Sequence, residues 1–217
     1  MIEVHVQDAE FFRLLGYPRG HQPEGRAAEL AAWARDWYAE HGRPWTYQRE
    51  VAGPERAFLV AVSAGPEVEE EAQRCWRDGH PDEYFFLEIF GSAVVEHLVA
   101  AASGRICARA EGDGLIAVPH YSPGYTGWDL TDQSKLLALI RGDRPHPFPE
   151  TVEVLSSGML RPKKSQLAVF GLTARTPEAL ASARLVPCRN CSFSPCQYRR
   201  ARYRHAPDPA TDLVPAS

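Results

Sequence analysis

The chain has 217 residues, of which 44% are hydrophobic, and it carries a formal net charge of -4. This length and apolar content are ample for one large domain or two small ones with a buried core. A net negative charge provides no global field for polyanions, and no apolar run approaches the length of a membrane span, so we expect no nucleic-acid partner and no membrane partner.

The N-terminus and the cysteine content indicate the compartment. The stretch MIEVHVQDAEFF carries acidic residues early and lacks the apolar core and small-residue cleavage site of a secretory signal. Five cysteines in a chain without such a signal indicate a reducing environment. We therefore expect a cytoplasmic protein.

The first part of the chain predicts a helix and then a pair of strands. Residues 24–42 place apolar side chains at spacings of three and four, which is typical of an amphipathic helix. Residues 45–51 and 56–65 are rich in aromatic and β-branched residues. Gly53 and Pro54 separate these two runs and favour a turn between them.

Two helices are predicted next. Residues 66–79 open with proline, carry acids in the first turn and close on glycine, which matches helix start and stop signals. Residues 82–110, with Asp82 as the expected cap, form the longest helical segment and are too apolar for a surface helix. This segment should lie at the centre of the fold.

The second half of the chain mixes one helix with strands. Asp129 is suited to cap a helix over residues 130–142, which carries an apolar stripe. Residues 151–157 and 166–173 read as strands joined by residues 158–165. A short helix is expected over residues 176–185, with Thr176 as cap and Pro177 in its first turn. Strands mixed with long helices, without regular βαβ alternation, favour the α+β class.

The loop HYSPGYTGWDL, residues 120–130, is the first candidate site. Pro123 followed by Gly124 is the composition of a type II turn, which would expose backbone amides. Tyr121, Tyr125 and Trp128 would surround those amides with flat faces able to stack a planar ligand. The alternative is an ordered loop packed by its own aromatic side chains.

The segment CRNCSFSPCQYRR is the second candidate site. Cys188, Cys191 and Cys196 are spaced closely enough for three thiolates to meet one zinc ion or an iron-sulfur cluster. His205 or a partner chain would supply the fourth ligand. The alternative is that these cysteines are free or redox-paired thiols.

Two further features concern charge. The only basic patch consists of arginines interleaved with tyrosines within residues 198–204, and it either docks an acidic partner or is solvated. Glu96 lies in the apolar segment GSAVVEHL, where a carboxylate needs a partner such as a ligand amine or an arginine.

Five segments, in order along the chain, carry a resemblance to a known family. They are FFRLLGYPRG, GSAVVEHL, HYSPGYTGWDLTDQ, GMLRPKKSQLAVFGL and CRNCSFSPCQYRR. Together they resemble the S-adenosylmethionine-binding activation domain of cobalamin-dependent methionine synthase, as a divergent stand-alone member. The resemblance implies a mainly antiparallel bent sheet with packed helices. It also implies one domain over residues 1–205, with a Cys/Arg-rich segment at 188–205 and a disordered tail at 206–217.

The resemblance also implies a function. A protein of this kind binds S-adenosylmethionine in a shallow groove and docks on a corrinoid protein or methyltransferase. It supplies the methyl group that, with one electron from a reductase, restores methylcobalamin on that partner.

The site residues implied by the resemblance come from three segments. The loop contributes the backbone around Ser122, Pro123 and Gly124, and Tyr125 would lie near the sulfonium or the corrin face. Glu96 matches an acid placed to meet the ligand's amino group. Lys164 and Ser165 would form the neighbouring edge of the groove.

His120 departs from the family pattern. Five residues before the loop tyrosine the family normally has an arginine, whose fork can hold the ligand's carboxylate. Histidine cannot make that fork, which would weaken carboxylate binding by about 1.5–3 kcal/mol. His120, Tyr125 and Glu96 are therefore the residues on which the chemistry is expected to depend.

This departure supports a second hypothesis, that of a cofactor-independent enzyme on the same scaffold, working in natural-product biosynthesis. It would close a strained nitrogen ring such as an aziridine by intramolecular displacement, with a paralogous chain as a second subunit. His120 or Glu96 would hold or deprotonate the amine, and Lys164 or a hydroxyl would steady the leaving anion. A third reading is a binding module without catalysis.

Overall fold

The structure is a computed structural model, and it describes residues 3–177 except residues 19, 54, 126, 143–147 and 149–151. The predicted helix beyond Pro177, the Cys/Arg-rich segment 188–205 and the tail 206–217 lie outside the described residues.

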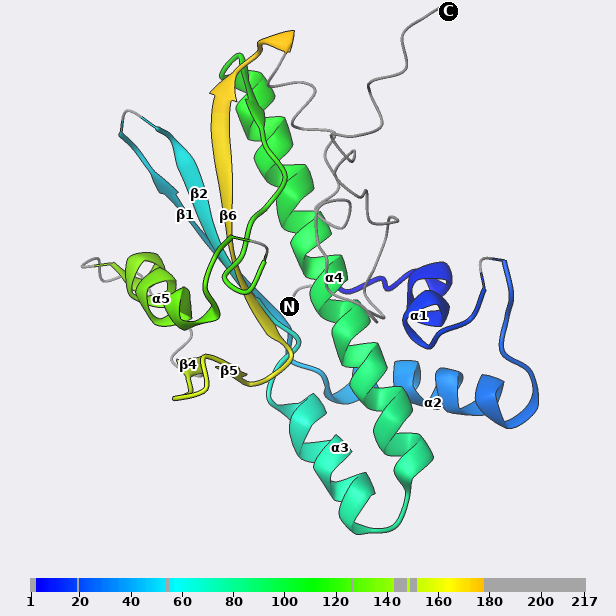
Figure 1. The fold of residues 1–217 in the computed structure, drawn as a ribbon. Helices are drawn as coiled ribbons and strands as arrows, with labels where there is room; N and C mark the ends of the chain where they lie inside the picture. Colours follow the sequence, from blue (N-terminus) through cyan, green and yellow to red (C-terminus); the bar gives the residue numbers. More distant parts are fainter. Residues whose placement is uncertain are drawn as a thin grey trace, which may run out of the picture.

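The centre of the fold is a four-stranded antiparallel sheet with the order β1-β2-β6-β3 (Figure 1). Its strands are β1 (Trp45–Val51), β2 (Ala57–Ser63), β3 (Leu115–Ala117) and β6 (Ser165–Ala174). The inner strand β2 pairs along its whole length with residues 165–171 of β6, and Phe58 lies directly opposite Phe170. This arrangement confirms the α+β class and the mainly antiparallel sheet.

One face of the sheet is covered by the long helix α4 (Pro81–Gly112), which is packed in turn by α1 (Asp8–Leu14), α2 (Gly25–His41) and α3 (Glu67–Arg77) (Figure 1). The largest core cluster lies here and joins α4 to the inner strands through side chains such as Leu98, Ile106 and Phe170. The predicted central position of this helix is thus confirmed.

The other face of the sheet is covered by a smaller cluster. The short 3₁₀ helix η1 (Leu130–Asp132) leads into α5 (Gln133–Arg141), whose apolar stripe contacts this face. Asp129 caps the start of η1, since its carboxylate accepts the Thr131 amide at 2.8 Å. A two-stranded sheet of β4 (Glu153–Val154) and β5 (Leu160–Arg161) borders this cluster.

Two predicted elements differ in the structure. The long helix begins at Pro81 with His80 as its cap, so Asp82 lies inside the first turn. The strand expected over residues 151–157 is only the two-residue β4, which pairs with β5 inside the expected connection. Gly158, at φ +81°, lies in the tight turn between β4 and β5, and its amide donates to the Leu155 carbonyl at 2.9 Å.

The apolar composition of α4 has a structural explanation. Among the described residues it is the one helix long and apolar enough to cross a membrane, so the expectation that no apolar run approaches that length was wrong. Most of its apolar stretch, 61%, is buried inside the protein, as expected for a core helix. Packing against the sheet and three helices therefore accounts for its hydropathy.

Candidate functional site

The loop of residues 118–129 is fastened to β6. Tyr121 and Val169 exchange two backbone hydrogen bonds, with N···O distances of 2.9 and 2.8 Å. Side chains alternate between the two faces of extended backbone, so His120 and Ser122 leave on the opposite side from Tyr121. That side is the one covered by α4.

The predicted type II turn is present, but its amides are occupied. Gly124 has φ +90°, and the Tyr125 amide donates to the Ser122 carbonyl at 3.0 Å. The Gly124 amide donates to the Trp128 carbonyl at 2.9 Å. The expectation that these amides would face a ligand was therefore wrong, because the loop uses them itself.

The aromatic residues of the loop pack largely on one another. Tyr121 and Trp128 stack with their planes 13° apart and their centroids 5.8 Å apart. Tyr125 meets the edge of Tyr121 at 86°. Tyr121 and Trp128 therefore act as packing within the loop, which was the alternative interpretation.

Ser122 and Tyr125 both contact one strand side chain, Gln166, and His120 joins this group through Tyr125. Its Nε2 lies 3.1 Å from Ser122 Oγ and 3.3 Å from Tyr125 Oη. Tyr125 Oη also lies 3.1 Å from His120 Nε2. Ser122 is only 3% exposed, so its hydroxyl is available to the protein rather than to bulk water.

The His120 imidazole is also held by packing, since its ring lies 5.6 Å from that of Phe170. Phe170 belongs to the core cluster beneath α4 and is 1% exposed. His120 therefore joins the hydrophobic core to the polar group around Gln166.

A second polar group lies where β6 begins. The Lys164 ammonium is 2.9 Å from Ser92 Oγ and 3.0 Å from a carboxylate oxygen of Glu88, both on α4. Gly91 makes this approach possible, because a Cβ at that position would lie 3.1 Å from Lys164 Cγ and 2.7 Å from Val68 Cγ1. The absence of a side chain at Gly91 thus admits the Lys164 side chain against the helix.

Glu88 serves both neighbouring lysines. Lys163 Nζ lies 2.6 Å from the other Glu88 oxygen, and the Lys163 amide donates to Glu69 at 3.0 Å. Burial opposes the charged form of Lys163, but the hydrogen bond and charge of Glu88 outweigh burial and raise the pKa of that lysine.

Glu96 lies on the same row of α4 as Glu88 and Ser92, because residues four apart share one side of a helix. α4 and β6 run in the same direction, so one helical turn beyond Ser92 brings Glu96 to the level of Gln166. Glu96 is half-buried. The helix thus contributes a polar row to a site whose other wall is β6 and the loop.

Ser165 lies at the margin of this site. Its hydroxyl donates to Ser63 Oγ at 2.9 Å, and Ser63 in turn accepts the Gly65 amide at 3.1 Å. Ser165 therefore contributes to the connection between β2 and β6, and Lys164 is the closer of the two to the α4 row.

The structure thus places the predicted loop residues and Lys164 in two hydrogen-bonded groups, with Glu96 on the same row of α4, and adds residues that the sequence reasoning missed. Gln166 joins the loop residues, and Glu88 with Ser92 anchors Lys164. Glu88 carried the same signal as Glu96, a carboxylate in an apolar helix eight residues earlier. Nothing in the sequence pointed to Gln166 except that it is a polar residue within a predicted strand.

The predicted metal ligands Cys188, Cys191 and Cys196 lie outside the described residues. Within the part of the chain that the structure describes, no cluster of three or more His, Cys, Asp or Glu side chains is placed to hold a metal ion. Cys75 is buried in α3, and Cys107 is exposed on α4.

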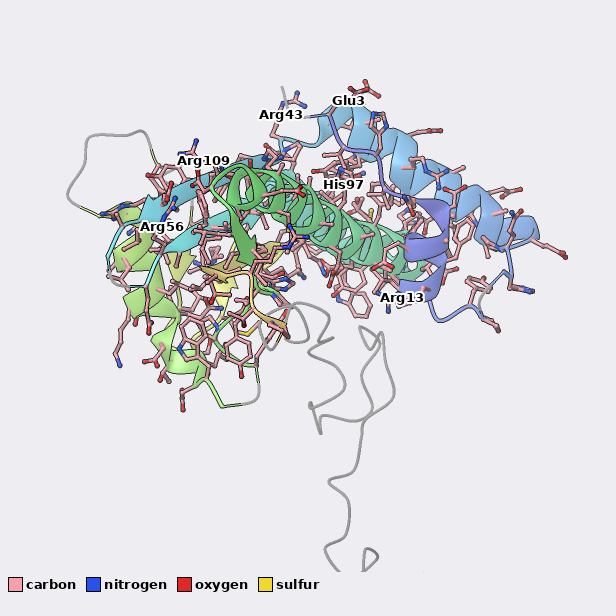
Figure 2. All side chains as sticks on the ribbon, turned by 90° about the horizontal axis from the view of Figure 1, so that it is seen from above. Glu3, Arg13, Arg43, Arg56, His97 and Arg109 are labelled. Atoms are coloured by element: carbon pink, nitrogen blue, oxygen red, sulfur yellow. The ribbon has the colours of Figure 1, made fainter. Side chains whose placement is uncertain are left out.

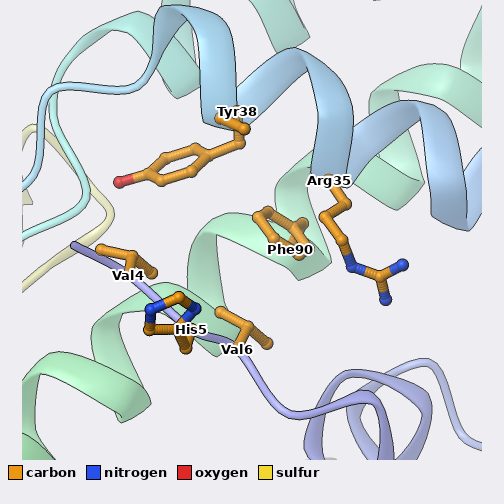
Figure 3. Close-up of a pocket in the computed structure, with 7 residues that line it drawn as sticks. Val4, His5, Val6, Arg35, Tyr38 and Phe90 are labelled. Atoms are coloured by element: carbon orange, nitrogen blue, oxygen red, sulfur yellow. The ribbon is translucent and has the colours of Figure 1, made fainter.

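A hollow of about 160 Å³ lies elsewhere, between the N-terminal segment and α2. Figure 3 shows Val4, His5 and Val6 facing Arg35 and Tyr38 of α2, with Phe90 of α4 behind them. None of the predicted site residues lines it. The Tyr38 hydroxyl donates to the Ala64 carbonyl at 2.8 Å, and burial, with the charge of Glu67, raises the pKa of this phenol.

The fold and this site define a class of protein: an α+β domain in which a long core helix and the inner strand of an antiparallel sheet enclose polar groups beside an aromatic loop. No family model matches the sequence, and no curated protein does. Among solved structures, the fold resembles the crystal structure of the MetH reactivation domain bound to AdoHcy, with a TM-score of 0.54. The match covers 75% of this chain and 72% of that chain at 11% identity, so it is a similarity of fold.

Proposed function

We propose that this protein binds S-adenosylmethionine in the region between the loop of residues 120–125, β6 and α4. The observation that carries the proposal is the hydrogen-bonded group in which Gln166 bonds Ser122 and Tyr125 and Tyr125 in turn bonds His120, beside the polar row of the core helix. The fold similarity to a domain bound to AdoHcy supports an adenosyl compound as the ligand.

Each charged part of such a ligand has a partner of suitable chemistry here. Glu96 would meet the amino group, and the aromatic ring of Tyr125 would attract the sulfonium cation. Lys164, held by Glu88 and Ser92, would face the carboxylate that the family's arginine normally binds. Pro123, Gly124 and Ser165 would shape the groove, because Pro123 has no amide N–H and the Gly124 amide and Ser165 hydroxyl are bonded within the protein.

The proposed role is reductive methylation of a corrinoid on a partner methyltransferase. Transfer of a methyl group to reduced cobalt requires alignment of donor and acceptor rather than movement of a proton. The chain would therefore contribute positioning, with cobalamin carried by the partner. The Cys/Arg-rich segment would dock on that partner or hold a zinc ion or iron-sulfur cluster.

One observation favours a second function, cofactor-independent ring closure. His120 stands where the related family has arginine, and its Nε2 lies 3.1 Å from Tyr125 Oη. An imidazole in a hydrogen-bonded pair can accept a proton near neutral pH, which a guanidinium cannot. His120 would take the proton from a substrate amine whose nitrogen displaces a leaving anion within the same molecule. Lys164 would stabilise that anion, and a paralogous chain would complete the enzyme.

Calorimetric titration with S-adenosylmethionine and AdoHcy tests the first function. We expect saturable binding that Glu96→Gln weakens and His120→Arg tightens about tenfold or more, because arginine restores a charged hydrogen bond. His80→Arg adds the same charge at an exposed position and serves as the control. Absence of binding at millimolar ligand, in the natural chain and in His120→Arg alike, would contradict the proposal and leave ring closure as the better candidate.

A further inference from the structure

A second hollow, of about 310 Å³, lies between the edge strand β1 and the C-terminal half of α4. It is lined by Gln48, Glu50, Phe58, Arg105, Ile106 and Arg109. The first two come from β1, Phe58 from β2 and the last three from α4.

This hollow is separate from the site around Gln166. Arg105 follows Glu96 by nine residues, or two and a half helical turns, which places it on the opposite side of α4. The sheet order agrees, because β1 and β2 line the hollow while β6 lines the candidate site. A ligand in one site would therefore not occupy the other.

The floor of the hollow is apolar. Phe58 and Ile106 belong to the core cluster and are 6% and 1% exposed. The walls are polar, with Gln48 exposed on β1 and the two arginines exposed on α4. Four of the six lining residues are polar or charged, so the hollow suits an anionic ligand with a small apolar part.

Most of the charges at the rim compensate one another. Arg56 donates to Glu50 at 3.0 Å and to Asp113 at 2.7 Å. Arg109 lies 3.7 Å from the same Asp113 carboxylate, and Figure 2 shows Arg56 and Arg109 at the same end of the molecule. These contacts lower the pKa of Asp113, the hydrogen bond from Arg56 being the largest cause.

Arg105 is the exception at this rim. Among the described residues no carboxylate forms an ion pair with Arg105. The other two arginines do have acidic partners: Arg56 pairs with Glu50 and Asp113, and Arg109 pairs with Asp113. Three guanidinium groups thus face two carboxylates, which leaves one positive charge. Arg105 and Arg109 are four residues apart, so both side chains can reach one anion above the floor.

We propose that this hollow binds a small organic acid, whose carboxylate or phosphate is held by Arg105 with help from Arg109 and whose apolar body rests on Phe58 and Ile106. The planar guanidinium matches either anion with two parallel hydrogen bonds. One unmatched positive charge favours an anion, and the apolar residues Phe58 and Ile106 distinguish an organic acid from an inorganic ion.

Binding of four probes to the full chain tests the proposal by NMR or calorimetry: phenylacetate, its neutral analogue phenylacetamide, phenyl phosphate and inorganic phosphate. We expect saturable binding of phenylacetate or phenyl phosphate, and the stronger of the two identifies the anion. Phenylacetamide and inorganic phosphate should bind at least about tenfold more weakly, because each lacks one of the two interactions. Equal binding of phenylacetate and phenylacetamide, or no binding of either organic anion, would overturn the proposal.

Variants locate the binding. Arg105→Gln should weaken the preferred probe about tenfold or more, and Arg105→Lys, which keeps the charge but not the fork, should weaken it less. Arg109→Gln should have the smaller effect of the two glutamine variants, because Asp113 already neutralises part of its charge. Arg43→Gln is the matched control, since Arg43 is an exposed arginine that bonds the carbonyls of Glu40 and Gly42. An unchanged affinity in Arg105→Gln would place the probe elsewhere and reject the site.

Discussion

Glu88 on the core helix α4 and Lys164, the residue immediately before β6, form an ion pair with an N···O distance of 3.0 Å. Their side chains are only 12% and 13% exposed. Lys163 reaches the second oxygen of the same carboxylate at 2.6 Å. One acid thus holds two adjacent lysines. When one charge of such a group is removed, its partners remain in poorly hydrated surroundings without a counter-charge, and an unpaired charge there destabilises the fold.

The first prediction compares the loss of the one acid with the loss of one of its two lysines. Glu88→Gln should destabilise the protein more than Lys164→Met, because it leaves two ammonium groups facing each other while the lysine variant leaves the Glu88 and Lys163 pair intact. We expect the difference in the free energy of unfolding to be about 1–3 kcal/mol, as for other partly buried ion pairs that lose one member. Urea unfolding of both variants and of the double variant measures it. An equal loss in the two single variants would contradict the shared role of Glu88.

The second prediction compares two glycines of α4. A Cβ at Gly91 would lie 2.7 Å from Val68 Cγ1 and 3.1 Å from Lys164 Cγ, whereas a Cβ at Gly104 would have no atom within 4 Å. Gly91→Ala should therefore lower the free energy of unfolding by about 1–3 kcal/mol. Gly104→Ala should raise it by about 0.5–1 kcal/mol, because alanine is the better helix former. Opposite shifts of the urea midpoint are the expected result, and a gain in both variants would show that Lys164 does not need the space at Gly91.

The third prediction concerns the loop. Gln166→Leu removes the hydrogen bonds to Ser122 and Tyr125, so the loop should lose part of its fastening to β6. We expect faster amide hydrogen exchange over residues 121–128 and a loss of about 1–2 kcal/mol, because the buried Ser122 hydroxyl loses its partner. Gln73→Leu, an exposed change on α3, is the control. Unchanged exchange in the loop would mean that the backbone pairing of Tyr121 alone holds it.

The fourth prediction is a pH dependence. Burial, and to a lesser degree the charge of His5, lowers the pKa of His97. The folded state therefore binds fewer protons than the unfolded state below the ordinary histidine value of about 6.5. The contribution of His97 to stability is then complete above that pH and falls as the pH decreases toward the lower folded value.

His97→Gln should accordingly flatten the fall in unfolding free energy between neutral and mildly acidic pH, as measured by urea titration at several pH values. His80→Gln, at an exposed position, should leave the slope as it is. A slope that is the same in His97→Gln and in the natural chain would assign the pH dependence to other groups.

Helix positions and the turn were predictable because their signals are local. Apolar spacing of three and four marked α2 and α5, and Pro123 with Gly124 marked the turn, because backbone angles there depend on neighbouring residues. The short strands β3 and β5 gave no such signal. Each is stabilised by its partner strand, and neither has enough residues for a pattern of its own.

For the candidate site too, some features were predictable from the sequence and others only from the structure. The sequence alone determined which residue types were unusual for their surroundings: a carboxylate in an apolar helix, a histidine before an aromatic loop and adjacent lysines before a strand. Only the tertiary structure decided that Gln166 joins the loop residues, that Glu88 anchors both lysines and that the turn amides serve the loop. Those outcomes depend on the register of β6 against the loop and on the contact of Lys164 with α4. Such relations between distant segments arise from packing of the whole core, and no short stretch of sequence contains them.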